Sequence, residues 1–389
     1  MSESQTAATP APARVFFLQP QVEHYRIPIW DGLVERGAGR YSIEVYGPLN
    51  DGRAFGGEAR PYLRGLDYRE KSVLGKTMFY WPGLFKMLRA SEPDVVISAV
   101  GLRYLDCWRL PRVCRSFGAV PIGWGKAHSV SELPPFLLSL AKKRMYQSFE
   151  LLIAYGQLTR REFLEAGVRE ENTFVAQNTI DTRRIFCEGD AIRRRGEALR
   201  EAAGLRGRCV LLCIARFNED KRHRDLLAAW PRLRELDDGL RLVLVGGGPL
   251  LESIREQAAT IDPERILVTG RVPEGDDYAW VSTASYNIQP GAVGLAINQS
   301  LAFGVPTIIA DEVGSDTEIV EHRVTGWRYP RGDLDALVSL IEELHADEPH
   351  RKEVVGRAVQ RMRDEVTIDN MVDRIDAAIR LALKRQPKT

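Results

Sequence analysis

Short apolar runs alternate with helix-like segments along most of the chain, and this alternation constrains the fold more than any other feature. It is typical of parallel sheets, in which each strand is followed by a crossover helix. A first series of strands is expected at Arg14 to Leu18, Tyr41 to Tyr46, Asp94 to Val100, Ala119 to Gly123, Leu151 to Tyr155 and Thr173 to Ala176. A second series is expected at Cys209 to Ala215, Leu240 to Val245, Arg265 to Val268, Ser285 to Ile288 and Pro306 to Ala310. Two such series predict an α/β protein with two Rossmann-like, doubly wound domains.

The length of 389 residues fits two domains. Residues 1–13 lack the basic and apolar regions of a secretory signal, and we expect a disordered tail there. The first domain is expected at 14–180 and the second at 181–367, followed by a helix and tail at 368–389. Asp51 to Ser72 is expected to be irregular. Thr182 to Ala203 is charged helix-forming sequence with little apolar periodicity, and we expect it to connect the domains.

Composition excludes several classes of protein. No apolar run approaches the ~20 residues of a membrane-spanning helix. The five cysteines form no CxxC pair and are odd in number, which argues against a disulfide framework. Cys107 and Cys114 are expected to be buried thiols on one helix rather than a metal or redox site. Free thiols fit a reducing compartment, so we expect a cytoplasmic protein.

The charge is unevenly distributed, although the net charge is only +1. Residues 14–180 hold 23 Lys and Arg against 17 Asp and Glu, whereas residues 181–389 hold 31 against 35. A basic first half indicates an anionic partner, such as a lipid-phosphate surface or an acidic acceptor. Ordinary surface arginine is the alternative interpretation. We expect no nucleic acid among the partners.

Four loops at expected strand ends of the second half could bind a ligand, because open α/β sheets bind ligands there. Arg216 and Lys221 share one loop and could hold a diphosphate, or they are solvated charges. Gly246 to Gly248 lacks the third glycine of a dinucleotide fingerprint. Pro290 to Pro306 reads as a glycine-rich turn that opens a helix, whose free amides favour an anion. The fourth loop, Asp311 to Glu318, ends in an acid that helix capping alone could explain.

Together these loops resemble the donor half of family 4 glycosyltransferases, over roughly 209–327. The resemblance implies the GT-B fold, with two domains facing a cleft and a final helix that crosses back to the first. It also implies a role for each loop. Arg216, Lys221, Gly294 and Leu295 would bind the donor diphosphate; Arg271, Val272 and Gln299 the nucleoside; and Gly291, Ala292, Val293 and Glu318 would lie beside the donor sugar.

The chain departs from the family pattern at four positions. Gly291 and Gln299 stand where the signature has two glutamates, and Ala215 and Arg222 stand where glycines are usual. Gln299 keeps an acceptor oxygen for the ribose hydroxyls, whereas Gly291 offers the sugar no side chain. Family members retain the anomeric configuration by a route that needs no protein nucleophile. Turnover is therefore expected to depend on stabilising the leaving diphosphate.

The first half is expected to supply acceptor and sugar contacts. His128 resembles a family histidine that faces the donor sugar and is the first candidate for a catalytic residue. His24 is the second candidate, and each could instead be structural. Arg103, Trp124 and Lys126 are expected on the acceptor side, at or just after strand ends. Phe79 to Lys86 and Phe136 to Met145 combine apolar residues with cations. Either segment could touch an anionic membrane, although a core-packed helix also explains the pattern.

The leading hypothesis is a retaining hexosyltransferase that uses a nucleotide-diphosphate sugar and needs no cofactor or metal. No metal-ligand spacing is found in the sequence, and the Asp333-Leu334-Asp335 motif is explained by helix capping. The acceptor is expected to be a glycan or a lipid-linked hydroxyl in bacterial polysaccharide or glycoconjugate synthesis, at the inner face of the membrane. Two alternatives remain: a sugar-nucleotide epimerase of the same fold, and a non-catalytic nucleotide-sugar-binding protein.

Overall fold

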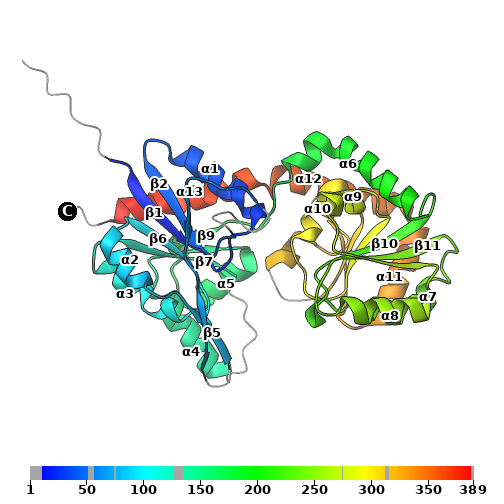
Figure 1. Ribbon diagram of the computed structural model, residues 1–389, viewed down its shortest axis with the longest axis horizontal. Coiled ribbons are helices and arrows are strands. Elements are labelled where there is room, and N and C mark those ends of the chain that lie inside the picture. The colour runs from blue at the N-terminus through cyan, green and yellow to red at the C-terminus, as the bar shows by residue number, and fades with distance from the viewer. Residues whose placement is uncertain are drawn as a thin grey trace, which may run out of the picture. The chain divides into compact units, whose positions relative to one another are not determined.

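The computed structural model describes residues 11–50, 57–73, 76–126, 135–273, 275–311 and 315–386. The chain divides into two compact units (Figure 1). Unit 1 comprises Met1–Gln177 and Asp369–Thr389, and unit 2 comprises Asn178–Ile368. The division thus lies a few residues before the boundary expected at 180, and the last helix belongs to the first unit.

Unit 1 is built on a seven-stranded parallel sheet in the order β3-β2-β1-β6-β7-β8-β9. The chain runs from β1 to one side and later returns to the other, so the topological switch point lies between β1 and β6. The inner strands are continuous apolar runs, because helices cover both faces of the sheet. The strands are β1 (Ala13–Leu18), β2 (Tyr41–Gly47), β3 (Leu63–Gly65), β6 (Val95–Ala99), β7 (Val120–Gly125), β8 (Leu151–Ala154) and β9 (Thr173–Val175).

Helices α2 (Leu84–Ser91), α3 (Leu110–Arg115), α4 (Pro135–Tyr146) and α5 (Gln157–Glu165) cover one face of this sheet. The other face carries α1 (Ile27–Gly37) and α13 (Ile368–Arg385). A Cβ on Gly32 would lie 2.9 Å from Val372 Cγ2, so α1 and α13 pack closely. Tyr41 Oη donates to Asp376 Oδ1 at 2.8 Å, and Arg36 pairs with Asp373 at 2.8 Å.

The segment expected to be irregular contains two strands. Leu63–Gly65 forms the edge strand β3, and β4 (Arg69–Val73) pairs antiparallel with β5 (Lys76–Tyr80). All five residues of β4 are exposed. A three-residue edge strand and a solvated hairpin bury few side chains. Their sequences therefore lack the apolar runs that predict strands.

Cys107 and Cys114 are buried as expected, and burial raises the pKa of each thiol to about 12. They do not share one helix, however. Cys107 lies on a 3-10 turn, Leu105–Trp108, and Cys114 lies on α3. The sequence shows no break between the two because both residues face the same core.

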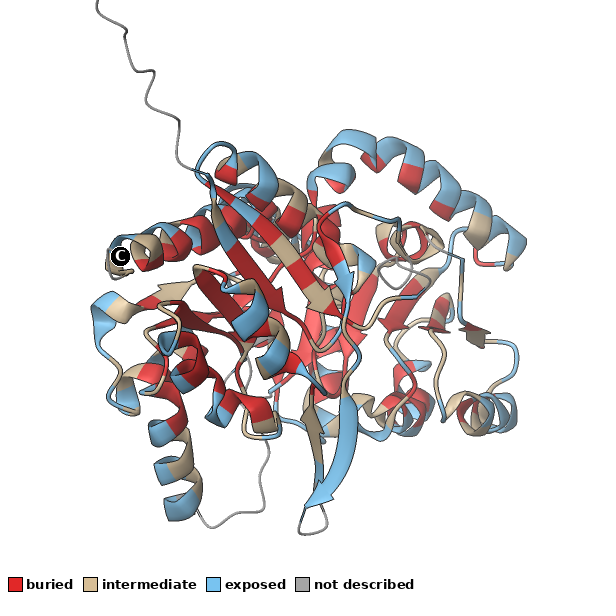
Figure 2. Cartoon of the chain, turned by 60° about the vertical axis from the view of Figure 1, so that its left-hand side comes forward, coloured by how far each residue is buried: buried red, intermediate tan, exposed pale blue. Residues whose placement is uncertain are grey.

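Unit 2 is built on a six-stranded parallel sheet in the order β12-β11-β10-β13-β14-β15, with its switch point between β10 and β13. In Figure 2 the strands of both sheets are largely buried. The last of these strands, β15, was not expected from the sequence. The strands are β10 (Cys209–Ile214), β11 (Leu240–Val245), β12 (Ile266–Gly270), β13 (Tyr286–Gln289), β14 (Thr307–Ala310) and β15 (Trp327–Tyr329).

Two helical layers enclose this second sheet. One face carries α7 (His223–Leu233), α8 (Leu251–Ile261) and α11 (Leu334–Ala346). The other carries α6 (Arg183–Ala202), α9 (Asp276–Ser282) and α10 (Ala296–Phe303), and α12 (Glu348–Asp364) contributes to both cores. Among the described residues, no helix combines the length and apolarity needed to cross a membrane.

Helix α6 occupies the segment that was expected to connect the domains. It packs on unit 2 through Ile185, Gly189, Ile192 and Gly196, which lie on one face. A Cβ on Gly196 would lie 2.4 Å from Ala279 O, so α9 approaches the bare backbone. Two of the four buried positions are glycines, and an apolar-periodicity search therefore misses the buried face.

Candidate functional site

The loops after β10 and β13 meet at the switch point of unit 2. Ala292 N donates to Asp220 O at 2.8 Å, and Lys221 Nζ donates to Ala292 O at 2.5 Å. Because β10 and β13 are paired neighbours, both loops leave the carboxyl edge of the sheet at the same place. The structure thus joins the Arg216–Lys221 loop to the loop that holds Gly291 and Gly294.

Gly291 is fixed by close backbone contact. A Cβ at this position would lie 2.1 Å from Asp220 O and 2.8 Å from the Lys221 carbonyl carbon. Real Cβ atoms do not approach backbone this closely, so any side chain requires the two loops to separate. Gly291 is therefore part of the joint between the loops.

Several groups at this joint are available to an anion. Arg216 is exposed and, among the described residues, has no ion pair. No intramolecular hydrogen bond of the described chain uses the amides of Gly294 and Leu295, which precede α10. A Cβ on Gly294 would lie 3.8 Å from Lys221 Nζ, so the ammonium is close to these amides. This combination suits a phosphate or diphosphate.

Arg222 stands at a position where the resemblance to family 4 glycosyltransferases implies glycine, and its backbone conformation is one that favours glycine. Its φ of 54° and ψ of 38° lie in the left-handed region that favours glycine. Arg222 Nε donates to Asp225 Oδ2 at 2.7 Å, which partly offsets the strain. Ala215, at the other glycine position, has no such φ and accommodates its Cβ.

His223 follows Arg222 in the sequence and was not among the predicted site residues. Its ring lies 4.2 Å from the Phe217 ring, and both ring nitrogens are buried without a partner among the described residues. Burial, together with the nearby charge of Lys221, lowers the pKa of His223 to about 4. The imidazole is therefore neutral at physiological pH.

The Gly246–Gly248 loop packs against the Arg216 loop. Phe217 N donates to Gly247 O at 2.9 Å, and a Cβ on Gly248 would lie 2.5 Å from Phe217 O. The φ values of Gly246 and Gly248, 142° and 157°, also favour glycine. Close contact between this loop and the Arg216 loop therefore explains why glycine is needed at 246 and 248.

The loop expected to hold the base follows β12 and joins the same set. Gly246 N donates to Gly270 O at 3.0 Å. Arg271 is exposed, whereas Val272 packs partly against the core of unit 2. A nucleoside could thus reach the Arg271 side chain and the local backbone.

Gln299 has an acidic neighbour that sequence reasoning missed. Gln299 Nε2 donates to Asp277 Oδ2 at 3.1 Å, while Asp277 Oδ1 accepts from Gly275 N at 3.1 Å. Gln299 Oε1 is buried and has no partner within the described part of the chain. A glutamate here would place a second carboxylate against Asp277, so the amide suits this neighbour. Only the fold brings the two positions together.

The two remaining donor-side candidates differ in access. Val293 is buried in the core of unit 2, so only its backbone is available to a sugar. Glu318 is half-buried on a short 3-10 helix, Ser315–Ile319, that follows β14. Any contact that Val293 makes with a sugar would therefore use its backbone rather than its side chain.

In unit 1, His24, Arg103 and Lys126 are exposed at the carboxyl edge of the sheet, after β1, β6 and β7 respectively. Trp124 was also expected on the acceptor side, but it is only 1% exposed and belongs to the interior. His128 lies outside the described residues.

The structure adds Arg26 to this edge. Its guanidinium carbon lies 5.4 Å from the ring centroids of both Trp124 and Tyr155, and its Nη2 donates to Tyr155 Oη at 2.9 Å. Within the described residues no carboxylate pairs with Arg26, and its Nη1 is buried without a partner. A cation held by aromatic rings at a switch point favours an anionic ligand nearby. From the sequence, Arg26 is expected near His24, but its contact with the Trp124 and Tyr155 rings is seen only in the structure.

The comparisons with known proteins agree with these features. The family model for glycosyl transferases group 1 matches residues 197–361, which include all the donor-side loops described above. Over 258 residues the chain is 28% identical to the GDP-mannose-dependent alpha-(1-6)-phosphatidylinositol monomannoside mannosyltransferase of Mycolicibacterium smegmatis. That match covers 64% of this chain and 64% of the relative, so it spans less than two thirds of the relative's length.

Solved structures show the fold. HepE from Anabaena, in complex with UDP, superposes with a TM-score of 0.71 at 14% identity, covering 95% of this chain and 100% of that chain. A protein described as a putative UDP-N-acetylglucosamine 2-epimerase from Listeria monocytogenes gives a TM-score of 0.68 at 15% identity, covering 98% and 99%. The chain has the GT-B fold with two Rossmann-like domains. The fold alone does not separate transferase from epimerase.

Proposed function

We propose that this protein is a retaining, metal-independent hexosyltransferase that moves a sugar from a nucleotide-diphosphate donor to a hydroxyl acceptor. One observation carries the proposal. Lys221 lies beside the amides of Gly294 and Leu295, which are unpaired among the described residues, and the same loop carries the exposed Arg216; all four are within the segment that matches glycosyl transferases group 1. The similarity to a curated mannosyltransferase supports the same reaction class.

In the proposed reaction, the acceptor hydroxyl forms a bond to the anomeric carbon while the bond to the diphosphate breaks. The acceptor attacks on the face from which the diphosphate leaves, and the diphosphate takes the hydroxyl proton. Arg216, Lys221 and the amides stabilise the negative charge that develops on the leaving group. Two side-chain cations supply the positive charge that a divalent ion would otherwise provide. Adding Mg²⁺ or Mn²⁺ is therefore expected to leave the transfer rate unchanged.

For the nucleoside, Gln299 Oε1 is the proposed acceptor for a ribose hydroxyl, and Arg271 with the Val272 backbone is the proposed base contact. Gly291, Ala292, Val293 and Glu318 are the proposed neighbours of the sugar, the first three through backbone. The donor used by the Mycolicibacterium relative makes GDP-mannose the first to test, with UDP-glucose second.

For the acceptor, we propose a glycan or lipid-linked hydroxyl recognised by the carboxyl edge of unit 1, including Arg103 and Lys126, and we propose catalytic roles for His24 and His128. Arg26 favours an acceptor with an anionic group. Helix α4 exposes Phe136, Leu137 and Leu140, at 74%, 47% and 50%. Lys143 and Arg144 are exposed on the same helix. We propose a cytoplasmic protein that binds an anionic membrane through this apolar and basic surface.

Nucleotide-sugar binding by the purified chain tests the donor assignment, with GDP-, UDP-, ADP- and TDP-sugars compared by calorimetry and transfer assays. Arg216→Ala should weaken donor binding by about 1.5–3 kcal/mol, the range for a hydrogen bond to a charged group. Arg206→Ala is a matched control, because Arg206 is exposed in unit 2 away from these loops. Unchanged donor affinity in Arg216→Ala would remove the diphosphate site from this loop.

The alternatives predict different outcomes. An epimerase would exchange solvent hydrogen into a nucleotide sugar without any acceptor, and a binding protein would hold the donor without transfer or hydrolysis. Acceptor recognition is tested separately by Arg26→Met, which should raise KM for an anionic acceptor and leave the donor Kd unchanged. An unchanged acceptor KM would contradict the role of Arg26.

A further inference from the structure

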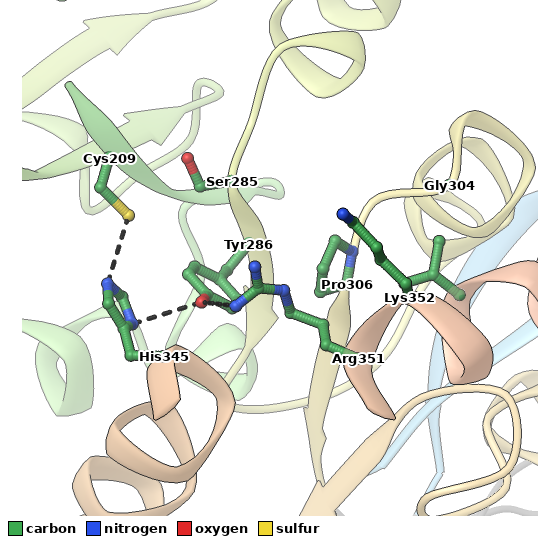
Figure 3. A pocket seen from close by; sticks show the side chains of 9 residues that line it. Cys209, Ser285, Tyr286, Gly304, Pro306, His345, Arg351 and Lys352 are labelled. Atoms are coloured by element: carbon green, nitrogen blue, oxygen red, sulfur yellow. Dashed lines mark hydrogen bonds between the residues drawn. The ribbon is translucent and has the colours of Figure 1, made fainter. Parts of the chain in front are cut away.

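A second polar cluster lies at the opposite end of β10 from Arg216. It borders a pocket of about 440 Å³ at the amino edge of the unit 2 sheet, lined by Cys209, Ser285, Tyr286, Gly304, Pro306, His345, Arg351, Lys352 and Val355 (Figure 3). Cys209 is the first residue of β10, and His345 lies in the last turn of α11. Nothing in the proposed transfer reaction uses this edge of the sheet.

Three potential metal ligands converge beside the pocket. Cys209 Sγ and His345 Nε2 are 3.8 Å apart, and His345 Nε2 and Asp237 Oδ2 are 3.8 Å apart. All three ligand atoms lie within 4.8 Å of one another. Tetrahedral Zn²⁺ with its usual bond lengths would place such atoms about 3.4–3.6 Å apart. Side-chain movements of a few tenths of an ångström to about an ångström would therefore complete the geometry.

Neighbouring groups orient two of these ligands. Tyr286 Oη lies 3.2 Å from His345 Nδ1 and accepts from Arg351 Nη1 at 3.0 Å. With its second lone pair, the phenol oxygen can accept Nδ1–H, which leaves the lone pair of Nε2 directed at Cys209 and Asp237. Asp237 Oδ1 accepts from Gly239 N at 2.6 Å, which leaves Oδ2 free for a metal. Metal-binding histidines and carboxylates commonly have outer partners of this kind.

We propose that Cys209, Asp237 and His345 form a Zn²⁺ site with a fourth position open to the pocket. One thiolate, one imidazole and one carboxylate are ligands that Zn²⁺ accepts together, and the two anions neutralise its charge. Burial raises the pKa of the Cys209 thiol, but coordination would deprotonate it outright. The ion would link the start of β10, the loop before β11 and the end of α11. Its expected role is to stabilise unit 2.

Cobalt substitution tests the thiolate directly. Purified full-length protein, kept reduced and freed of metal with a chelator, is titrated with Co²⁺ and then with Zn²⁺. The expected result is a sulfur-to-cobalt charge-transfer band with one ion per chain, which Zn²⁺ abolishes by displacement. Cys209→Ser should remove the band, and His345→Gln should weaken Zn²⁺ binding by more than about 100-fold, beyond the range for a lost outer partner.

Matched controls separate the site from adventitious binding. Cys187→Ser removes an exposed thiol elsewhere on unit 2, and His350→Gln removes a nearby histidine outside the cluster. Both should bind Zn²⁺ like the parent, and Tyr286→Phe should bind about tenfold more weakly. A cobalt band that persists in Cys209→Ser, or equal Zn²⁺ affinity in His345→Gln and His350→Gln, would overturn the proposal. Circular dichroism checks that each variant is folded.

Discussion

Gly291 stands at a position where the resemblance to family 4 glycosyltransferases implies a glutamate. Loss of a glutamate side chain alone would leave space beside Gly291. That space is instead filled by the backbone of Asp220 and Lys221. The backbone of the Lys221 loop thus occupies the space that a side chain at 291 would need. The sequence shows only that a carboxylate is missing and cannot show what replaced it.

Restoring the glutamate should therefore impair the site. Gly291→Glu is expected to force the two loops apart and to weaken donor binding more than tenfold, about 1.4 kcal/mol or more. Calorimetry with the best nucleotide sugar measures this effect. Gly356→Glu is the control, because a Cβ on that glycine meets nothing within 4 Å. If Gly291→Glu binds the donor as well as or better than the parent, the glutamate fits and the packing account is wrong.

Arg222 offers a test of local strain. Arg222→Gly and Arg222→Ala both lose the ion pair with Asp225, but only glycine relieves the left-handed backbone. The glycine variant is expected to be more stable than the alanine variant by about 1 kcal/mol. Urea unfolding measures the difference. Equal stability would mean that the backbone at 222 is not strained.

His223 should make stability depend on pH. Its pKa is lowered to about 4 in the folded protein, below its ordinary value, so the unfolded chain binds the proton more readily. The resulting stability is fully present above about pH 6.5 and is lost as the pH falls towards 4, by about 3 kcal/mol in total. His223→Leu should remove this loss, whereas His350→Gln should keep it. Urea unfolding between pH 7.5 and pH 4.5 measures the slope, and identical slopes in parent and His223→Leu would contradict the assignment.

Most strands of the two parallel sheets, and the loops that follow them, were accessible from the sequence, because parallel strands buried on both faces are continuous apolar runs; the edge strands β3 and β15 were missed. The packing of helix α6 on unit 2 could not be predicted from the sequence, because Gly189 and Gly196 contribute no apolar signal to its buried face. The β4–β5 hairpin could not be predicted either, because its exposed residues form no apolar run. The pairs Gln299–Asp277 and Cys209–His345 depend on contacts between distant elements, which no spacing rule encodes.

Helix α4 carries the proposed membrane contact. Replacing Phe136, Leu137 and Leu140 with serine should reduce binding to vesicles of anionic lipid at least tenfold, because each exposed apolar side chain would lose its burial in the interface. Vesicle co-sedimentation measures binding, with neutral vesicles as the comparison. Replacing the exposed Val34 on α1 and Val324 with serine gives a matched apolar control. Equal sedimentation of both variants would exclude α4 as the contact.

The last helix, α13, packs on unit 1, and its contacts with β2 and α1 are expected to contribute to the stability of that unit. Asp376 is buried on α13, accepts from Tyr41 Oη at 2.8 Å and pairs with Arg380 Nε at 2.9 Å. Asp376→Ala would leave the buried Tyr41 hydroxyl without its acceptor and should destabilise unit 1 by about 1–3 kcal/mol. Asp373→Ala loses only the exposed pair with Arg36 and should cost at most about 1 kcal/mol.

Hydrogen exchange can assign the loss of stability to one unit, because each unit has its own core. In Asp376→Ala, faster exchange is expected in β1, β2 and α13, while β10, β11 and β13 keep their protection. Donor binding, which we assign to unit 2, should survive the substitution at temperatures where unit 1 remains folded. Equal loss of protection in both sheets would show that the two units unfold as one cooperative body, and the stability of the donor site would then depend on the last helix as well.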